Sequence, residues 1–155
     1  MMLDTNIVSA FLKADAHQKT PRLFEFVTTQ LTTEGLAIAY MTQFELRRGI
    51  EELVRRGQGR RKLVDFDKFM ERVHVLGLDA AMGEGWNLAA RLWAEGRLKG
   101  RVFADADLLI AATAASHGHE FATSDIGLAE CLRQLAFPVS VRLVAVDSVA
   151  LVRPP

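Results

Sequence analysis

The stretch Met1-Met2-Leu3-Asp4-Thr5-Asn6 at the start of the chain carries the pattern around which the fold is organised. A short apolar run leads into an acid, and apolar residues then recur at helical spacing, namely Ile7, Val8, Phe11 and Leu12. This pattern predicts a buried strand that ends at Asp4 and a helix over residues 5 to about 13. A carboxylate at the carboxyl end of a central parallel strand lies where open α/β sheets bind their ligands.

The bulk composition is that of an ordinary globular protein and predicts a single domain over residues 1–155. Lys plus Arg and Asp plus Glu are 19 each, so the net charge alone does not indicate a nucleic-acid partner. Cys131, the single cysteine, excludes an internal disulfide and a cysteine-based zinc site. The longest apolar stretches fall far short of the roughly 20 residues of a membrane span, so we expect a soluble, cytoplasmic protein without a membrane partner.

Strand-like and helix-like segments alternate along the rest of the chain. Further strands are predicted at 36–41, 73–76, 120–123 and 141–146, and helices at 21–33, 42–54, 60–72, 80–95, 105–115 and 124–135. The run at 36–41 is continuously apolar, as in a parallel strand covered on both faces, and the helix at 105–115 is apolar nearly all round, so it should be buried. This alternation predicts an α/β fold with a central parallel sheet between two helical layers.

Two local patterns carry more detailed expectations. Thr42 and Glu45 have the spacing of a capping box, which predicts a helix that begins at Thr42. Met82, Trp86 and Trp93 share one face of the helix at 80–95, and the two tryptophans are expected in the core.

Four acids stand at the starts of predicted helices: Asp4, Glu45, Asp107 and Asp125. Three of them directly follow a predicted strand, and the carboxyl ends of parallel strands meet at one edge of the sheet. The fourth, Asp107, joins them if its helix packs beside the first strand. The sequence therefore predicts a cluster of carboxylates at this edge.

Each acid alone has a simpler explanation, because a carboxylate in the first turn of a helix is stabilised by free backbone N–H groups and the helix dipole. Taken together, four carboxylates in one cleft would repel one another and raise some of their pKa values. Oxygen ligands without cysteine suit a hard divalent cation, Mg²⁺ or Mn²⁺, and such a site supports phosphodiester hydrolysis.

The residues at these positions resemble the four motifs of the PIN domain, with the VapC and FitB-like toxin branch most similar. The matching motifs are Leu-Asp-Thr-Asn at 3–6, Phe-Glu-Leu-Arg-Arg-Gly at 44–49, Asp-Leu-Leu-Ile-Ala-Ala-Thr-Ala at 107–114 and Ala-Thr-Ser-Asp at 122–125. Each motif is weak alone, but the four occur in order over nearly the whole chain. The resemblance implies a sheet sandwiched by helices, a metal-dependent ribonuclease activity and neutralisation by an antitoxin encoded alongside.

The resemblance also implies roles for individual residues. Asp4, Glu45, Asp107 and Asp125 match the acidic quartet that is both catalytic and metal-binding, with one or two Mg²⁺ or Mn²⁺ ions. Asn6 would orient Asp4 or a metal-bound water, and either Thr123 or Ser124 matches a hydroxyl position beside the fourth acid. The family's acid directly precedes the Leu-Leu-Ile-Ala-Ala run, which selects Asp107, so that Asp105 remains as an N-cap or a supporting group.

Basic residues crowd the segment between two predicted helices, namely Arg47, Arg48, Arg55, Arg56, Arg60, Arg61 and Lys62. Such a cluster could contact RNA phosphates, hold an acidic or C-terminal segment of an antitoxin, or be a solvated helix face. Arg47 or Arg48 could reach the acids, as could basic residues of the loop before Asp107, namely Arg97, Lys99 and Arg101.

These observations predict a metal-dependent endoribonuclease that is the toxin of a toxin–antitoxin pair, with RNA as substrate. By resemblance we also expect a homodimer and contact with DNA only through the antitoxin. One alternative is a PIN-like subunit that acts mainly in a DNA-bound regulatory complex with its partner. Another is an unrelated Mg²⁺-dependent phosphohydrolase, for which the Asp-x-Asp spacing of Asp105 and Asp107 would be the nucleophile motif.

Overall fold

The computed structural model describes residues 1–33, 35–78 and 83–146. Its strands are β1 (Met2–Leu3), β2 (Leu36–Ala39), β3 (Val73–Leu76), β4 (Phe121–Thr123) and β5 (Val141–Leu143). Its helices are α1 (Thr5–Phe11), α2 (Ala16–Lys19), α3 (Pro21–Thr33), α4 (Tyr40–Arg55), α5 (Arg60–Met70), α6 (Glu84–Leu98), α7 (Asp105–Ser116) and α8 (Ile126–Gln134). None of the helices in these ranges combines the length and apolar character that a membrane crossing requires.

The five strands form one sheet in the order β3-β2-β1-β4-β5, and every neighbouring pair is parallel. Leu3 of the central strand pairs with Ile38 on one side and with Ala122 on the other. The chain adds β2 and β3 on one side of β1, then crosses over to add β4 and β5 on the other. The carboxyl ends of β1 and β4 therefore flank a topological switch point, where sheets of this kind bind ligands.

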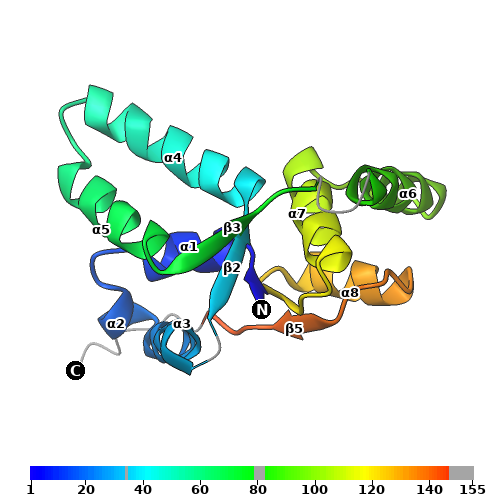
Figure 1. Ribbon diagram of the computed structural model, residues 1–155, viewed down its shortest axis with the longest axis horizontal. Coiled ribbons are helices and arrows are strands. Elements are labelled where there is room, and N and C mark those ends of the chain that lie inside the picture. Colours follow the sequence, from blue (N-terminus) through cyan, green and yellow to red (C-terminus); the bar gives the residue numbers. More distant parts are fainter. Residues whose placement is uncertain (34, 79–82, 147–155) are drawn as a thin grey trace, which may run out of the picture.

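Helices cover both faces of the sheet, as Figure 1 shows, and this confirms the predicted three-layer α/β/α fold. Alternate residues of the strands point to opposite faces, so Leu3 and Ile38 belong to one core cluster while Met2 and Ala39 belong to the other. The first cluster is completed by α1, α3, α4 and α5. The second is completed by α6, α7 and α8.

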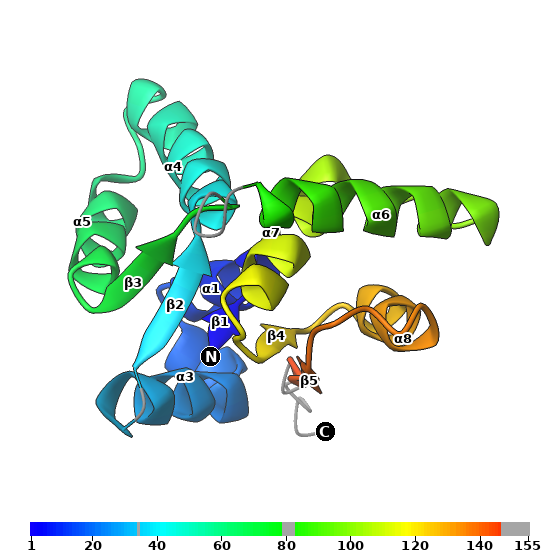
Figure 2. The ribbon, with the colours of Figure 1, turned by 45° about the vertical axis from the view of Figure 1, so that its right-hand side comes forward.

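Helix α7 is the buried helix that its composition predicts. Six of its residues are buried, and it packs against α6, α4, β2 and β4 (Figure 2). Because β2 and β4 are the two neighbours of β1 in the sheet, α7 lies over the central strand. The condition for bringing Asp107 to the carboxyl edge is therefore met.

The expectation that the tryptophans of α6 lie in the core was wrong, since Trp86 and Trp93 are 54% and 50% exposed. The buried face of α6 is instead the stripe of Gly85, Ala89, Leu92 and Gly96. Gly85 and Gly96 let α6 lie directly against Leu78 and Phe103, and the larger rings are left on the outer side. Met82 lies outside the described residues.

Candidate active site

Asp4 follows β1 directly and is buried, with only 3% of its surface exposed. It caps α1, because its Oδ1 accepts a hydrogen bond from the Thr5 backbone N–H at 2.7 Å. Its Oδ2 accepts a second one from the Thr123 hydroxyl at 2.6 Å. The pKa of Asp4 is raised to about 6, chiefly by burial and in smaller part by the charges of Asp107 and Glu45, although the hydrogen bonds from Thr123 and Thr5 lower it.

Thr123, the last residue of β4, links Asp4 to the turn between β4 and α8, where Asp125 lies. Its hydroxyl donates to Asp4 and accepts hydrogen bonds from the Asn6 side-chain amide at 3.2 Å and the Asp125 backbone N–H at 3.0 Å. Asn6 Oδ1 also accepts from the Ser124 backbone N–H at 3.3 Å. Of the two candidate hydroxyls it is therefore Thr123 that contacts Asp4, and Asn6 reaches Asp4 through it.

Glu45 comes from the second turn of α4 and lies across the edge from β1. Its Oε2 accepts a hydrogen bond from the Thr5 hydroxyl at 2.7 Å, and its Oε1 lies 3.6 Å from Arg48 Nη2. The predicted capping box is wrong: α4 already begins at Tyr40, and Ala39 is its N-cap. The helix starts earlier because β2 ends at Ala39, so that Thr42 is a buried residue within the first turn.

Asp105 and Asp107 both lie in the first turn of α7, and the structure distinguishes them. Asp107 is half-buried and faces the other acids: burial raises its pKa, and the charges of Asp125 and Glu45 raise it further. Asp105 is exposed, and no side-chain hydrogen bond or ion pair of it is found in the described part of the chain. Of the two roles expected for Asp105, that of N-cap was wrong, because the N-cap is Ala104; that of a supporting group stays a prediction.

Asp125 has the capping role that its position suggests, and it also belongs to the cluster. It is the N-cap of α8, where its Oδ1 accepts from the Leu128 backbone N–H at 2.9 Å. Its charge nevertheless contributes to the raised pKa of Asp107. The two aspartates also line one hollow of about 230 Å³ together with Arg101 and Phe103.

The four predicted acids are thus brought to one edge of the sheet, close enough to affect one another electrostatically. Negative charge on Glu45 raises the pKa of both Asp4 and Asp107. The charge of Asp107 also raises the pKa of Asp4, and the charge of Asp125 raises the pKa of Asp107. The Arg48 contact with Glu45 is the only ion pair that the described residues supply to any of the four. The excess negative charge is therefore largely uncompensated.

This donor set fits a divalent cation in its chemistry. All of its members are carboxylates, the oxygen ligands that Mg²⁺ and Mn²⁺ prefer. A cation would also relieve the repulsion that opposes ionisation of Asp4 and Asp107. Among the described residues, no three His, Cys, Asp or Glu side chains are grouped closely enough to hold an ion by themselves.

The predicted basic segment does not form one uniform patch. Arg47 pairs with Glu51 and Asp67 at 2.9 and 3.3 Å. Of the basic residues that the structure describes in this segment, Arg48 alone forms an ion pair with one of the four clustered acids, Glu45. Arg48 also lies over the Phe44 ring, 5.5 Å from its centroid. On the loop before Asp107, Arg101 lines the acidic hollow, whereas the Lys99 ammonium donates to the Gln134 carbonyl and Arg97 lies over Trp93.

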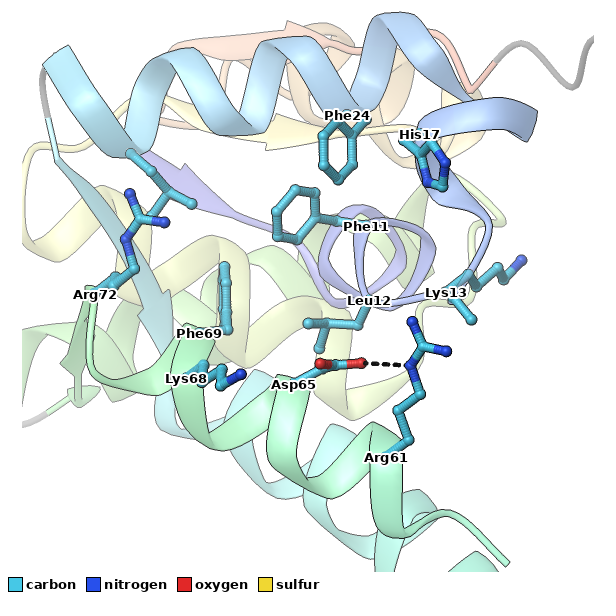
Figure 3. A pocket seen from close by; sticks show the side chains of 12 residues that line it. Phe11, Leu12, Lys13, His17, Phe24, Arg61, Asp65, Lys68, Phe69 and Arg72 are labelled. Carbon is cyan, nitrogen blue, oxygen red and sulfur yellow. Dashed lines mark ion pairs between the residues drawn. The ribbon is translucent and has the colours of Figure 1, made fainter.

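A second hollow, of about 260 Å³, lies between α1, α2, α3 and α5, and none of the four acids lines it (Figure 3). Its apolar wall includes three phenylalanines: the ring of Phe11 lies 5.2 Å from that of Phe24 and 5.9 Å from that of Phe69, centroid to centroid. Basic side chains surround it, namely Lys13, Arg61, Lys68 and Arg72, with Asp65 3.9 Å from Arg61. Sequence analysis pointed to Arg61 but missed this hollow, because its members are spread over four helices.

Comparison with known proteins identifies the family. The family model of the PIN domain matches residues 1–132. No curated protein matches the chain significantly.

Several solved structures share the fold. VapBC2 from Rickettsia felis bound to a promoter DNA fragment is 18% identical, with a TM-score of 0.73, over 92% of this chain and 96% of that one. FitAcB from Neisseria gonorrhoeae is 26% identical, with a TM-score of 0.66, over 90% and 94% of the two chains. DNA-bound VapBC from Salmonella typhimurium is 24% identical, with a TM-score of 0.68, over 91% and 95%. Since the PIN-domain match covers most of its residues and the acids of all four motifs lie at one edge of the sheet, this chain belongs to the PIN-domain family.

Proposed function

We propose that this protein is a divalent-metal-dependent endoribonuclease and the toxin of a toxin–antitoxin pair. The observation that carries the proposal is the uncompensated cluster of Asp4, Glu45, Asp107 and Asp125 at the switch point of the sheet, with the pKa values of Asp4 and Asp107 raised. PIN domains are generally nucleases, and the similar solved structures are VapBC and FitAB assemblies. We infer RNA as the substrate and the cytoplasm as the place of action.

Asp4, Glu45, Asp107 and Asp125 are the residues that would hold the cation. A bound Mg²⁺ or Mn²⁺ supplies a Lewis acid that activates water and neutralises charge on the phosphate. The chain itself orients the carboxylates: Thr123 fixes one oxygen of Asp4, and Thr5 fixes one oxygen of Glu45. Arg48 and Arg101 place positive charge beside the cluster, where it would attract the phosphates of a nucleic acid.

The phosphohydrolase alternative is not supported by the position of its motif. An Asp-x-Asp nucleophile would follow a strand, whereas Asp105 and Asp107 both lie inside the first turn of α7. The regulatory alternative keeps one observation in its favour, because two of the similar structures are VapBC assemblies bound to DNA. We propose that this chain would contact DNA only through its antitoxin.

The decisive experiment compares inducible expression of the wild type with Asp107→Asn, followed by analysis of total RNA. We expect the wild type to arrest growth and cleave RNA, and the variant to do neither. Asp105→Asn is the matched control, because it removes an exposed carboxylate two residues away and should behave as the wild type does. Equal toxicity of Asp107→Asn and wild type would refute the catalytic assignment and favour the regulatory alternative.

We further propose that the hollow of Figure 3 contributes to the antitoxin interface. Its apolar wall suits large side chains of a partner segment, and the basic residues around it suit acidic ones. Lys68→Glu combined with Arg72→Glu should weaken binding of the protein encoded next to this one, measured by calorimetry, while RNA cleavage by the free toxin is retained. Arg91→Glu on α6 serves as the control for charge reversal at an exposed site far along the chain. Unchanged antitoxin affinity in the double variant would place the interface elsewhere.

A homodimer completes the proposal. Large apolar side chains on α4 and α6 remain exposed in the single chain, with Tyr40 at 61%, Phe44 at 54% and Trp93 at 50%. Exposed aromatic groups of this size are typical of surfaces that meet a partner. Sedimentation analysis of the purified protein tests this, and a monomer at micromolar concentration would contradict it.

A further inference from the structure

We infer that Thr42 is a positioning residue, which holds the Glu45 carboxylate in place through the hydroxyl of Thr5. Thr42 lies in the first turn of α4 and its surface is 0% exposed. Because the helix begins before it, its hydroxyl does not cap the helix. Among the described residues, its hydroxyl makes a single side-chain hydrogen bond, with Thr5 Oγ1 at 3.2 Å. The inference rests on the proposed function only in assuming that Glu45 helps to bind the metal ion.

The direction of this hydrogen bond follows from counting protons. Thr5 Oγ1 has two neighbours, Glu45 Oε2 at 2.7 Å and Thr42 Oγ1 at 3.2 Å. An ionised carboxylate can only accept, so the shorter contact uses the one proton that the Thr5 hydroxyl carries. The proton between Thr5 and Thr42 must then belong to Thr42. Thr42 therefore donates to Thr5, and Thr5 donates to Glu45.

This arrangement gives Thr42 an effect on the site although it touches none of the acids. Because Thr42 donates to Thr5, the Thr5 hydroxyl proton is directed to Glu45. Hydrogen bonds in a chain that ends on a charged group strengthen one another. Thr5 also presents its backbone N–H to Asp4 at 2.7 Å. A fixed Thr5 therefore sets the positions of two acids from different elements, Asp4 after β1 and Glu45 in α4, and Thr42 anchors it from α4.

The test replaces Thr42 by valine, which keeps the shape and removes the hydroxyl, and by serine, which keeps the hydroxyl. Direct supporting partners of metal ligands are worth about 10-fold to 100-fold in metal affinity, and Thr42 acts one residue further away. We therefore expect Mn²⁺ affinity, measured by calorimetry without RNA, to fall by about threefold to tenfold in Thr42→Val. Thr42→Ser should bind Mn²⁺ nearly as well as the wild type.

The matched control is Thr113→Val. Thr113 is also a buried threonine in a helix, 2% exposed, but its hydroxyl donates to the Leu109 carbonyl, and no hydrogen bond within the described part of the chain links that hydroxyl to the acids. Its substitution should leave Mn²⁺ affinity unchanged. If Thr42→Val does not fold, Thr42→Ala removes the same hydroxyl with less bulk in the same position.

The sign of the effect decides the direction of the hydrogen bond. If Thr5 instead donated to Thr42, removal of the Thr42 hydroxyl would free the Thr5 proton for Glu45, and Mn²⁺ affinity would rise. Unchanged or increased affinity in Thr42→Val therefore overturns the inference.

A second readout needs neither metal nor RNA. In the metal-free wild type, the Thr5 hydroxyl proton should exchange slowly with water in NMR spectra and correlate with the Glu45 carboxyl carbon. Thr42→Val should speed this exchange and Thr42→Ser should preserve it; equal exchange rates in all three overturn the inference. If the wild type bound no Mn²⁺ at all, the proposed function would fail, and this proton would still decide the role of Thr42.

Discussion

Replacing Asp4 by asparagine should stabilise the metal-free protein at neutral pH while abolishing its metal response. The pKa of Asp4 is about 6 in the folded chain, against an ordinary value of 3.8. At about 1.4 kcal/mol per unit of pKa difference, the folded protein is destabilised by about 3 kcal/mol when Asp4 is ionised. Asparagine keeps an oxygen for the Thr5 backbone N–H and carries no charge, so it removes this penalty.

Part of the gain is lost at Thr123. Its hydroxyl already accepts two hydrogen bonds and donates its proton to Asp4, so the asparagine amide nitrogen finds no free acceptor there. A lost hydrogen bond costs about 1 kcal/mol, which leaves a net gain of about 2 kcal/mol. For a chain of this size, that gain raises Tm by about 4 to 8 °C.

The stability difference between Asp4→Asn and the wild type should depend on pH in a defined direction. Between about pH 4 and pH 6 the folded wild type binds more protons than the unfolded chain, because the pKa of Asp4 is higher in the folded state. The stability of the wild type therefore falls as the pH rises through this window, and the full penalty is present above it. Asparagine does not titrate, so the advantage of Asp4→Asn should be absent near pH 4 and complete by about pH 7.

Urea unfolding at a series of pH values, with a metal chelator present, measures this directly. Asp105→Asn is the control, and its stability should stay within about 0.5 kcal/mol of the wild type because the side chain is exposed. Adding Mn²⁺ at pH 7.5 should raise the Tm of the wild type and leave that of Asp4→Asn unchanged. A variant that is less stable than the wild type by the same amount at every pH would refute the reasoning.

Two further predictions concern neighbouring elements. Gly96→Ala should destabilise the protein by about 1–3 kcal/mol in urea unfolding, because a Cβ there would lie 2.7 Å from the Phe103 ring. The control Gly49→Ala adds a Cβ in open space on α4 and should stabilise the protein by about 0.5–1 kcal/mol. Equal effects of the two substitutions would argue against the close approach of α6 to the loop at 101–104. Asp125→Ala should lose the cap on the Leu128 backbone N–H and about 0.5–2 kcal/mol, while Asp125→Asn keeps the acceptor and the stability. If Asp125 also serves the acidic cluster, both variants should lose RNA cleavage to a similar degree; full activity in Asp125→Asn would confine it to capping.

Much of the candidate site was accessible from the order of residues along the chain. Asp4 and Asp125 each follow an apolar run and precede a helical stripe, and parallel strands must bring such positions to one edge. The buried character of α7 followed from its nearly uniform apolar composition, and the packing of this helix over the central strand brings Asp107 to the carboxyl edge of the sheet. Local patterns failed where a shift of one residue mattered, as with the tryptophans of α6.

The sequence by itself determined the alternation of strands and helices and the parallel sheet, because these depend on periodicity and chain direction, and it pointed to four acids near the edge where those strands end. Only the tertiary structure decided which side chains share hydrogen bonds across elements. It turned Thr42 from an apparent helix cap into a buried partner of Thr5, and it separated Asp107 from the exposed Asp105. Such contacts join residues 37 to 119 positions apart, and their geometry is set by packing of the helices on the sheet, which no local pattern encodes.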